Sequence, residues 1–164
     1  MVMRKIKITL ALENGHDGET CHDILESCPQ LEVVASLTDL TGHAAWLALG
    51  RSHLLLADEA LLLRDGFEPL NMLLSSYPEV HSLLILRNFS HDKMIWALMQ
   101  GVRGVLTIQE IRPLLVKALL RVMAGEIWTP RHLMQPIRRD LQQADDGSHV
   151  YRRPDTISEW VKWH

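Results

Sequence analysis

The sequence alternates short apolar segments with amphipathic ones, and this alternation repeats five times along the chain. Mostly apolar segments bounded by turn residues are typical of strands that enter the core of a sheet. They span residues 5–12, 31–37, 53–57, 82–86 and 102–107. Repeated strand–helix units of this kind favour a parallel sheet covered by helices on both faces. We therefore expect an α/β protein.

The segments between the strands carry helical spacing. In residues 111–122, apolar side chains recur every three or four positions, which predicts an amphipathic helix. We expect residues 15–18 to separate the first strand from its helix, Thr38 or Asp39 to cap the second helix, and Asp92 to cap the fourth. The remaining helices are predicted over 21–28, before Gly50, before Pro78 and over 93–100.

Charge and composition exclude several classes of protein. The net charge is −3 with a pI near 6.3, so this stretch is not a polybasic nucleic-acid binder. Apolar residues make up 47% of the chain, which excludes a disordered protein, yet no apolar run approaches the ~20 residues of a membrane span. Cys21 and Cys28 are the only cysteines, and no second pair completes a zinc site. We expect a cytoplasmic protein without membrane contact.

Five strand–helix units leave few topologies, because parallel crossovers are right-handed. The flavodoxin-like strand order 2-1-3-4-5 is the common one, and its binding site lies at the carboxyl ends of the strands. Glu13 and Asn14 follow the first strand and Asp58 ends the third. Leu86, Arg87 and Asn88 lie at the end of the fourth strand, and Thr107 and Ile108 lie at the end of the fifth. Together these residues define the candidate site.

Several motifs resemble the receiver domain of LuxR-type two-component response regulators, in which the receiver precedes a helix-turn-helix domain. The strongest are Gly101-Val-Arg-Gly104 and Ala124-Gly-Glu-Ile-Trp128. Asp58 falls where the family keeps its phosphoacceptor aspartate, and Gly66 matches the glycine that closes the following loop. The resemblance covers about residues 5–135 and implies a flavodoxin-like (βα)5 receiver fold with one or more extra C-terminal helices.

A working receiver binds Mg²⁺ through acidic residues and holds the phosphoryl oxygens with a hydroxyl and a lysine. By resemblance the metal ligands are Glu13, Asn14 and Asp58, although Asn14 has lost a negative charge. Three other positions have lost their functional groups, namely Leu86 for the hydroxyl, Ile108 for the lysine and Val105 for the switch aromatic. We interpret the domain as a pseudo-receiver, a signalling domain and not an enzyme, whose Asp58 is not phosphorylated. The alternative is a working phosphoacceptor that uses Asp58 and Mg²⁺.

Apolar and aromatic residues outside this site predict an interface or a ligand. The helix over 93–100 is more apolar than one buried face requires, so Met94 and Trp96 are either dimer contacts or packed residues. Trp128, at the start of an expected sixth helix, and Arg131 are similar to the Trp-x-x-Arg motif with which some pseudo-receivers bind cyclic di-GMP. Cyclic di-GMP sensing is therefore a second alternative, and simple packing of Trp128 is the other interpretation.

The expected domain organisation is a receiver-like domain over 1–128, followed over 129–164 by a sixth helix, a polar linker and a short terminal helix. Residues 156–159 form a capping-box pattern that opens the terminal helix, on which Trp160 and Trp163 are candidate interface residues. No helix-turn-helix follows, so contact with DNA needs a domain that this chain lacks. The expected function is signal input to a transcriptional regulator through homodimerisation, with a sensor histidine kinase as a further partner and no cofactor beyond Mg²⁺.

Overall fold

A computed structural model of the chain describes residues 4–13 and 15–129. Its strands are β1 (Ile6–Ala11), β2 (Leu31–Leu37), β3 (Leu54–Asp58), β4 (His81–Leu86) and β5 (Gly104–Thr107). Its helices are α1 (His16–Glu26), α2 (His43–Leu49), α3 (Glu59–Asp65), α4 (Glu68–Ser76), α5 (His91–Met99) and α6 (Ile111–Met123), and a 3₁₀ turn covers Ile108–Glu110. None of these helices combines the length and the apolar character that a membrane span requires.

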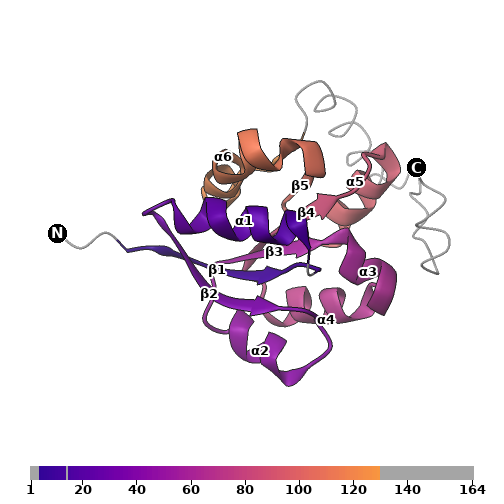
Figure 1. Cartoon of the computed structure of the whole chain (residues 1–164). Coiled ribbons are helices and arrows are strands. Elements are labelled where there is room, and N and C mark those ends of the chain that lie inside the picture. Colours follow the sequence, from indigo (N-terminus) through magenta and orange to yellow (C-terminus); the bar gives the residue numbers. More distant parts are fainter. Residues whose placement is uncertain (1–3, 14, 130–164) are drawn as a thin grey trace.

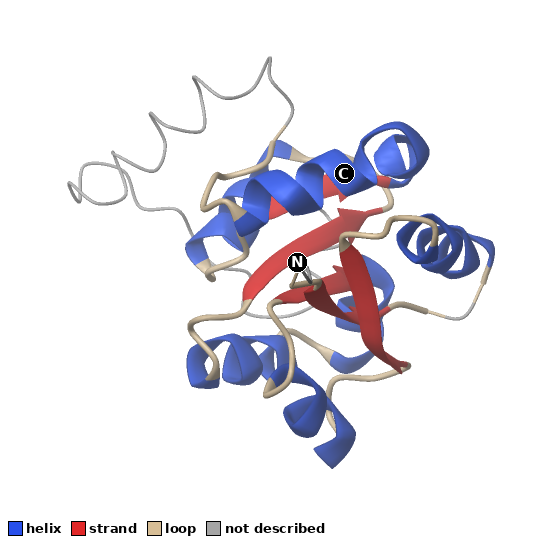
Figure 2. Ribbon diagram, turned by 90° about the vertical axis from the view of Figure 1, so that its left-hand side faces the viewer, coloured by secondary structure: helices blue, strands red, loops and turns tan. Residues whose placement is uncertain are grey.

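The strands form one parallel sheet in the order β2-β1-β3-β4-β5, which confirms the predicted fold class and strand order. Helices α1 and α6 lie together over one face of the sheet (Figure 1). Helices α2 to α5 contribute to the core on the other face, so that the sheet lies between two helical layers (Figure 2). This arrangement places the carboxyl ends of all five strands at one edge of the sheet.

The apolar residues 54–57 of β3 explain its central place. Successive side chains of a strand point to opposite faces, so Leu54 and Leu56 join the core beneath α1 and α6. Leu55 and Ala57 join the core beneath α2 to α5. All four side chains are buried, as expected of a strand that is covered on both faces.

Helix α3 is an element that the sequence pattern did not predict. It has seven residues, about two turns, which is too short for a 3.6-residue period to stand out from the apolar run that contains it. Its N-cap is Asp58, whose side chain accepts a hydrogen bond from the Ala60 N–H at 2.9 Å. The predicted acceptor aspartate is therefore also the N-cap of a helix.

Helix α1 begins earlier than predicted. The spacing of residues 15–18 predicts a break, but the helix starts at His16 and contains Gly18. A Cβ atom at Gly18 would lie 3.0 Å from the Glu13 carbonyl oxygen, so the missing side chain lets this turn pack against the end of the first strand.

Two predicted caps are also wrong. Helix α2 begins after Gly42, and the Asp39 carboxylate instead accepts hydrogen bonds from the N–H groups of Thr41 and Gly42 in the preceding turn. Helix α5 begins after Ser90, whose side chain accepts a hydrogen bond from the Lys93 N–H at 3.4 Å. Both differences shift the helix start by a few residues and leave its buried face unchanged.

Candidate functional site

The parallel sheet brings most of the predicted site residues to one edge. Asp58 ends β3 and Leu86 ends β4, while Glu13 and Ile108 lie just beyond β1 and β5. Asn14 falls outside the described residues. The predicted location of the site at the carboxyl ends of the strands therefore agrees with the observed topology.

Asp58 is half-buried, and its environment opposes ionisation of the carboxyl. Burial raises the pKa of Asp58 above its ordinary value. The hydrogen bond from the Ala60 N–H and the Arg87 guanidinium limit that rise, and the carboxylate of Glu13 adds to it. Because the Asp58 carboxylate caps α3, one of its oxygens is already committed to the fold.

Arg87 supplies positive charge at this edge. The strand order predicts its place in the candidate site, but the sequence pattern assigns it no specific role. Its guanidinium donates a hydrogen bond to the Glu13 carboxylate at 2.9 Å, and both side chains are about half exposed. The contact joins the residue after β4 to the residue that was predicted as a metal ligand. A guanidinium between carboxylates neutralises negative charge in the way that a bound cation does.

The described residues fit Mg²⁺ poorly. This ion requires nearly octahedral oxygen coordination and usually takes one or two free carboxylates. Here the Glu13 carboxylate pairs with Arg87, and the Asp58 carboxylate caps α3. A metal ion would have to compete with both contacts, so the predicted set of Glu13, Asn14 and Asp58 stays a prediction.

The three positions that are interpreted as degenerate from the sequence carry aliphatic side chains that pack on the core. Leu86 and Val105 are almost completely buried in the core beneath α2 to α5. Ile108 is half-buried and packs against the core beneath α1 and α6. None of the three side chains can donate a hydrogen bond to a phosphoryl oxygen.

A buried ion pair lies directly beside Asp58, and it was not predicted. Glu59 and Lys93 are only about 1% exposed, and their Oε2 and Nζ atoms are 2.6 Å apart. Glu59 Oε1 also accepts a hydrogen bond from the Arg87 N–H at 3.1 Å. The sequence carries one signal for this pair, because each charged residue is followed by a run of apolar residues on a short helix.

Of the two interpretations of Met94 and Trp96, dimer contacts or packed residues, their burial in the folded domain favours packing. Met94 is completely buried and Trp96 is 5% exposed. The Trp96 ring packs on Phe67, with ring centroids 4.3 Å apart. The surplus of apolar residues on α5 is explained by burial, since the segment between α3 and α4 covers the outer side of that helix.

Trp128 lies in an extended segment, so a sixth helix does not begin at this residue. It forms a parallel bridge with Gly104, in which its N–H donates to the Arg103 carbonyl and its carbonyl accepts from the Val105 N–H, both at 3.0 Å. Its side chain packs against the core beneath α1 and α6. Arg131, Trp160 and Trp163 fall outside the described residues, so the ligand and interface roles of these residues stay predictions.

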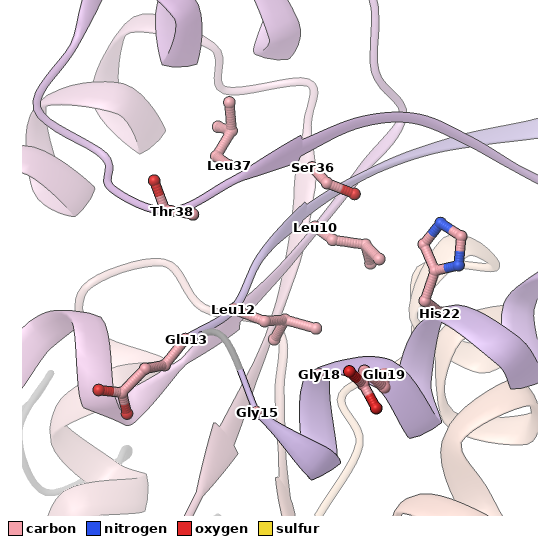
Figure 3. A pocket seen from close by; sticks show the side chains of 10 residues that line it. All are labelled: Leu10, Leu12, Glu13, Gly15, Gly18, Glu19, His22, Ser36, Leu37 and Thr38. Carbon is pink, nitrogen blue, oxygen red and sulfur yellow. The ribbon is translucent and has the colours of Figure 1, made fainter.

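A cavity of about 420 Å³ opens between β1, β2 and α1 (Figure 3). Its lining includes Leu10, Ser36 and His22, whereas Asp58 does not line it. The Glu13 side chain points away from His22 (Figure 3). Glu13 also lines the cavity, so the cavity adjoins the candidate site through this residue although it does not reach Asp58.

Comparisons with known proteins establish the fold. No family model matches the sequence, and no curated protein matches it. The apo receiver domain of RcsB from Salmonella enterica serovar Typhimurium matches with a TM-score of 0.70 and 19% identity, covering 82% of this chain and 99% of that chain. A LuxR-family response regulator from Aurantimonas sp. SI85-9A1 matches with a TM-score of 0.71 and 18% identity, covering 84% and 99%. The chain thus has the flavodoxin-like receiver fold with a C-terminal helix.

Asp58→Asn should raise the melting temperature at pH 7 by about 1–3 °C. The asparagine oxygen can still cap α3, and the substitution removes a carboxylate whose ionised form is disfavoured by burial. The pKa of Asp58 is higher in the folded state than its ordinary value of 3.8. The neutral carboxyl therefore contributes its full stability below pH 3.8, and this contribution is lost as the pH rises through the folded-state pKa. The gain from the substitution should therefore be full at neutral pH and vanish below about pH 4.

Asp39→Asn is the matched control for this measurement. Hydrogen bonds from Thr41 and Gly42 lower the pKa of Asp39, so removal of its charge should lower the melting temperature at pH 7. The melting temperatures of both variants are measured by thermal unfolding at several pH values. A lower melting temperature for Asp58→Asn at pH 7 would show that its carboxylate stabilises the fold.

Proposed function

We propose that this chain is a receiver-like signal-input domain of a transcriptional response regulator, acting through homodimerisation and without phosphorylation of Asp58. The observation that carries the proposal is the state of the two described carboxylates at the acceptor edge. Glu13 pairs with Arg87, and Asp58 caps α3. The Arg87 guanidinium and the Ala60 backbone N–H thus already bind the carboxylates that a working site would offer to a metal ion.

The electrostatics at this edge support the proposal. A phosphoryl group on Asp58 would bring nearly two negative charges close to Glu13 and Glu59. Two unit charges 4 Å apart interact with about 4 kcal/mol at an effective dielectric constant of 20, so the added charge needs new cations. The lysine position is occupied by Ile108, and the guanidinium of Arg87 is already paired.

Similar solved structures support a role in transcription. RcsB from Salmonella enterica serovar Typhimurium has been solved bound to promoter rprA in the presence of the phosphomimetic BeF3⁻. That structure matches with a TM-score of 0.61 and 16% identity, covering 90% of this chain and 70% of that chain. For this chain we propose a signalling role in the cytoplasm, contact with DNA through a separate domain, and a sensor histidine kinase as the further partner.

One observation favours a second candidate, a working phosphoacceptor. Asp58 is half-buried and lies at the open edge of the sheet, so a small phosphodonor has access to it. In this function Asp58 would act as nucleophile, and Mg²⁺ would have to displace Arg87 from Glu13. The two candidates make opposite predictions about how the chain responds to a phosphomimetic.

Sedimentation equilibrium of the full chain tests the proposed function. The chain should dimerise, and BeF3⁻ with Mg²⁺ should change its dimerisation constant by less than about twofold, whereas coupled ligands typically act by roughly 5–150-fold. Asp58→Asn should give the same constant as the parent. A chain that stays monomeric contradicts the dimerisation, and a tightening of five-fold or more that Asp58→Asn abolishes supports the second candidate.

A further inference from the structure

The Glu59 carboxylate contacts both ends of one connecting segment. Its Oε1 atom accepts a hydrogen bond from the N–H of Arg87, the first residue after β4. Its Oε2 atom lies 2.6 Å from Nζ of Lys93, in the first turn of α5. Residues 87–93 are thus held at both ends by a single buried anion.

Other contacts continue from this segment in both directions. The Arg87 side chain pairs with Glu13 after β1, so the segment is also tied to the first strand. From Lys93 onward, α5 is buried over five consecutive residues, and its Trp96 ring packs on Phe67. The position of residues 87–93 therefore sets the position of the start of α5.

The energetics of buried charge show what such a pair contributes. Taking both ions out of water is costly, and replacing a buried ion pair by apolar residues of similar volume is often neutral or stabilising. A pair that is almost completely enclosed is thus a poor source of net stability. What it does provide is a directional contact, since each oxygen of Glu59 binds a different donor.

We propose that Glu59 is a positioning residue that fixes residues 87–93 and α5 in one arrangement. Glu59 follows Asp58 in the sequence and binds an ammonium group and a backbone N–H. These are the kinds of donor that an anion on Asp58 would need. The inference rests on the proposed function and deepens it, because a built-in anion holds the domain in one state without modification of its neighbour.

Amide hydrogen exchange on the double variant Glu59→Met/Lys93→Met tests this inference. Two apolar side chains of similar length should keep the domain folded, while the segment loses both end contacts. We expect the N–H groups of residues 88–92 to exchange about tenfold faster, with unchanged protection in β3 and α6. Near-ultraviolet circular dichroism confirms that the tertiary fold is kept.

The exposed pair Arg121–Glu126 provides the matched control. Its atoms are 3.4 Å apart and both side chains are more than half exposed, so Arg121→Met/Glu126→Met should leave exchange in residues 88–92 unchanged. Glu59→Gln is a second test variant, because the amide oxygen can still accept from the Arg87 N–H but the charge is lost. Glu59→Gln should accelerate amide hydrogen exchange near Lys93 more than near Arg87.

Unchanged exchange in the folded double variant would overturn the inference, since Glu59 and Lys93 would then only fill space. Unfolding of the double variant would also overturn it, because the pair would then be required for stability. Failure of the proposed function is detected in a different experiment, in which BeF3⁻ changes the dimerisation constant of the parent chain. The two failures are therefore distinguishable.

Discussion

Lys93→Met is expected to lower the free energy of unfolding by about 3–5 kcal/mol, which is the usual cost of removing one partner from a buried ion pair. The substitution leaves the Glu59 carboxylate enclosed, with the Arg87 N–H at 3.1 Å but without its counterion. Adding Glu59→Met should recover most of the loss, because no buried charge then remains. Urea unfolding at pH 7, with comparison of the m-values, measures each variant.

Lys117→Met is the control for this prediction. Lys117 is exposed on α6, so the same change of side chain should alter stability by less than about 0.5 kcal/mol. A loss of under about 1 kcal/mol for Lys93→Met would contradict the interpretation, because the Glu59 carboxylate would then find other partners at little cost.

Gly104→Ala is expected to cost about 1–3 kcal/mol and to loosen the bridge between Trp128 and β5. A Cβ atom at this position would lie 2.7 Å from Leu83 Cδ1, 2.9 Å from Trp128 Cβ and 3.0 Å from the Trp128 carbonyl oxygen. Two of these three atoms belong to the bridging residue, so that segment has to move. Exchange of the Val105 N–H, which donates to the Trp128 carbonyl, should become faster together with the loss of stability.

Gly50→Ala is the control glycine. Its nearest heavy atoms would lie at 3.6 Å, and its φ of −63° suits any residue, so stability should change by less than about 0.5 kcal/mol. An equal loss at both positions would show that the effect at Gly104 comes from the backbone and not from the close approach of Trp128.

The sheet could be predicted from the sequence because its strands are short, apolar and separated by turn residues. The four apolar residues of β3 before Asp58 favour a central strand, and the order 2-1-3-4-5 agrees with the connection rules. Helix α3 could not be predicted, because two turns within a continuous apolar run carry no readable period. The bridge of Trp128 to Gly104 depends on tertiary packing and leaves no local pattern.

The location of the candidate site could also be predicted, but its contacts could not. Topology places Asp58 and Glu13 at one edge of the sheet. The contact of Arg87 with Glu13 joins residues 74 positions apart, and the pairing of Glu59 with Lys93 likewise joins two separate helices. The apolar residues of α5 indicated an interface only because the sequence does not show that Phe67 covers Trp96.

Side chains of opposite charge lie close together at this edge of the sheet. Arg87 offsets the charge of Glu13, and Lys93 offsets the charge of Glu59. The proposal that the domain works without phosphorylation rests in part on these contacts, and it depends on the chemistry of Asp58.

Intact mass spectrometry after incubation with acetyl phosphate and Mg²⁺ tests that chemistry most directly, with Asp58→Asn measured alongside. The account predicts that the folded parent gains no mass, because Glu13 and Asp58 are committed to Arg87 and to α3. A gain of one phosphoryl group in the parent, absent from Asp58→Asn, would contradict it. That result would show that Mg²⁺ displaces Arg87 and that the domain is a working phosphoacceptor.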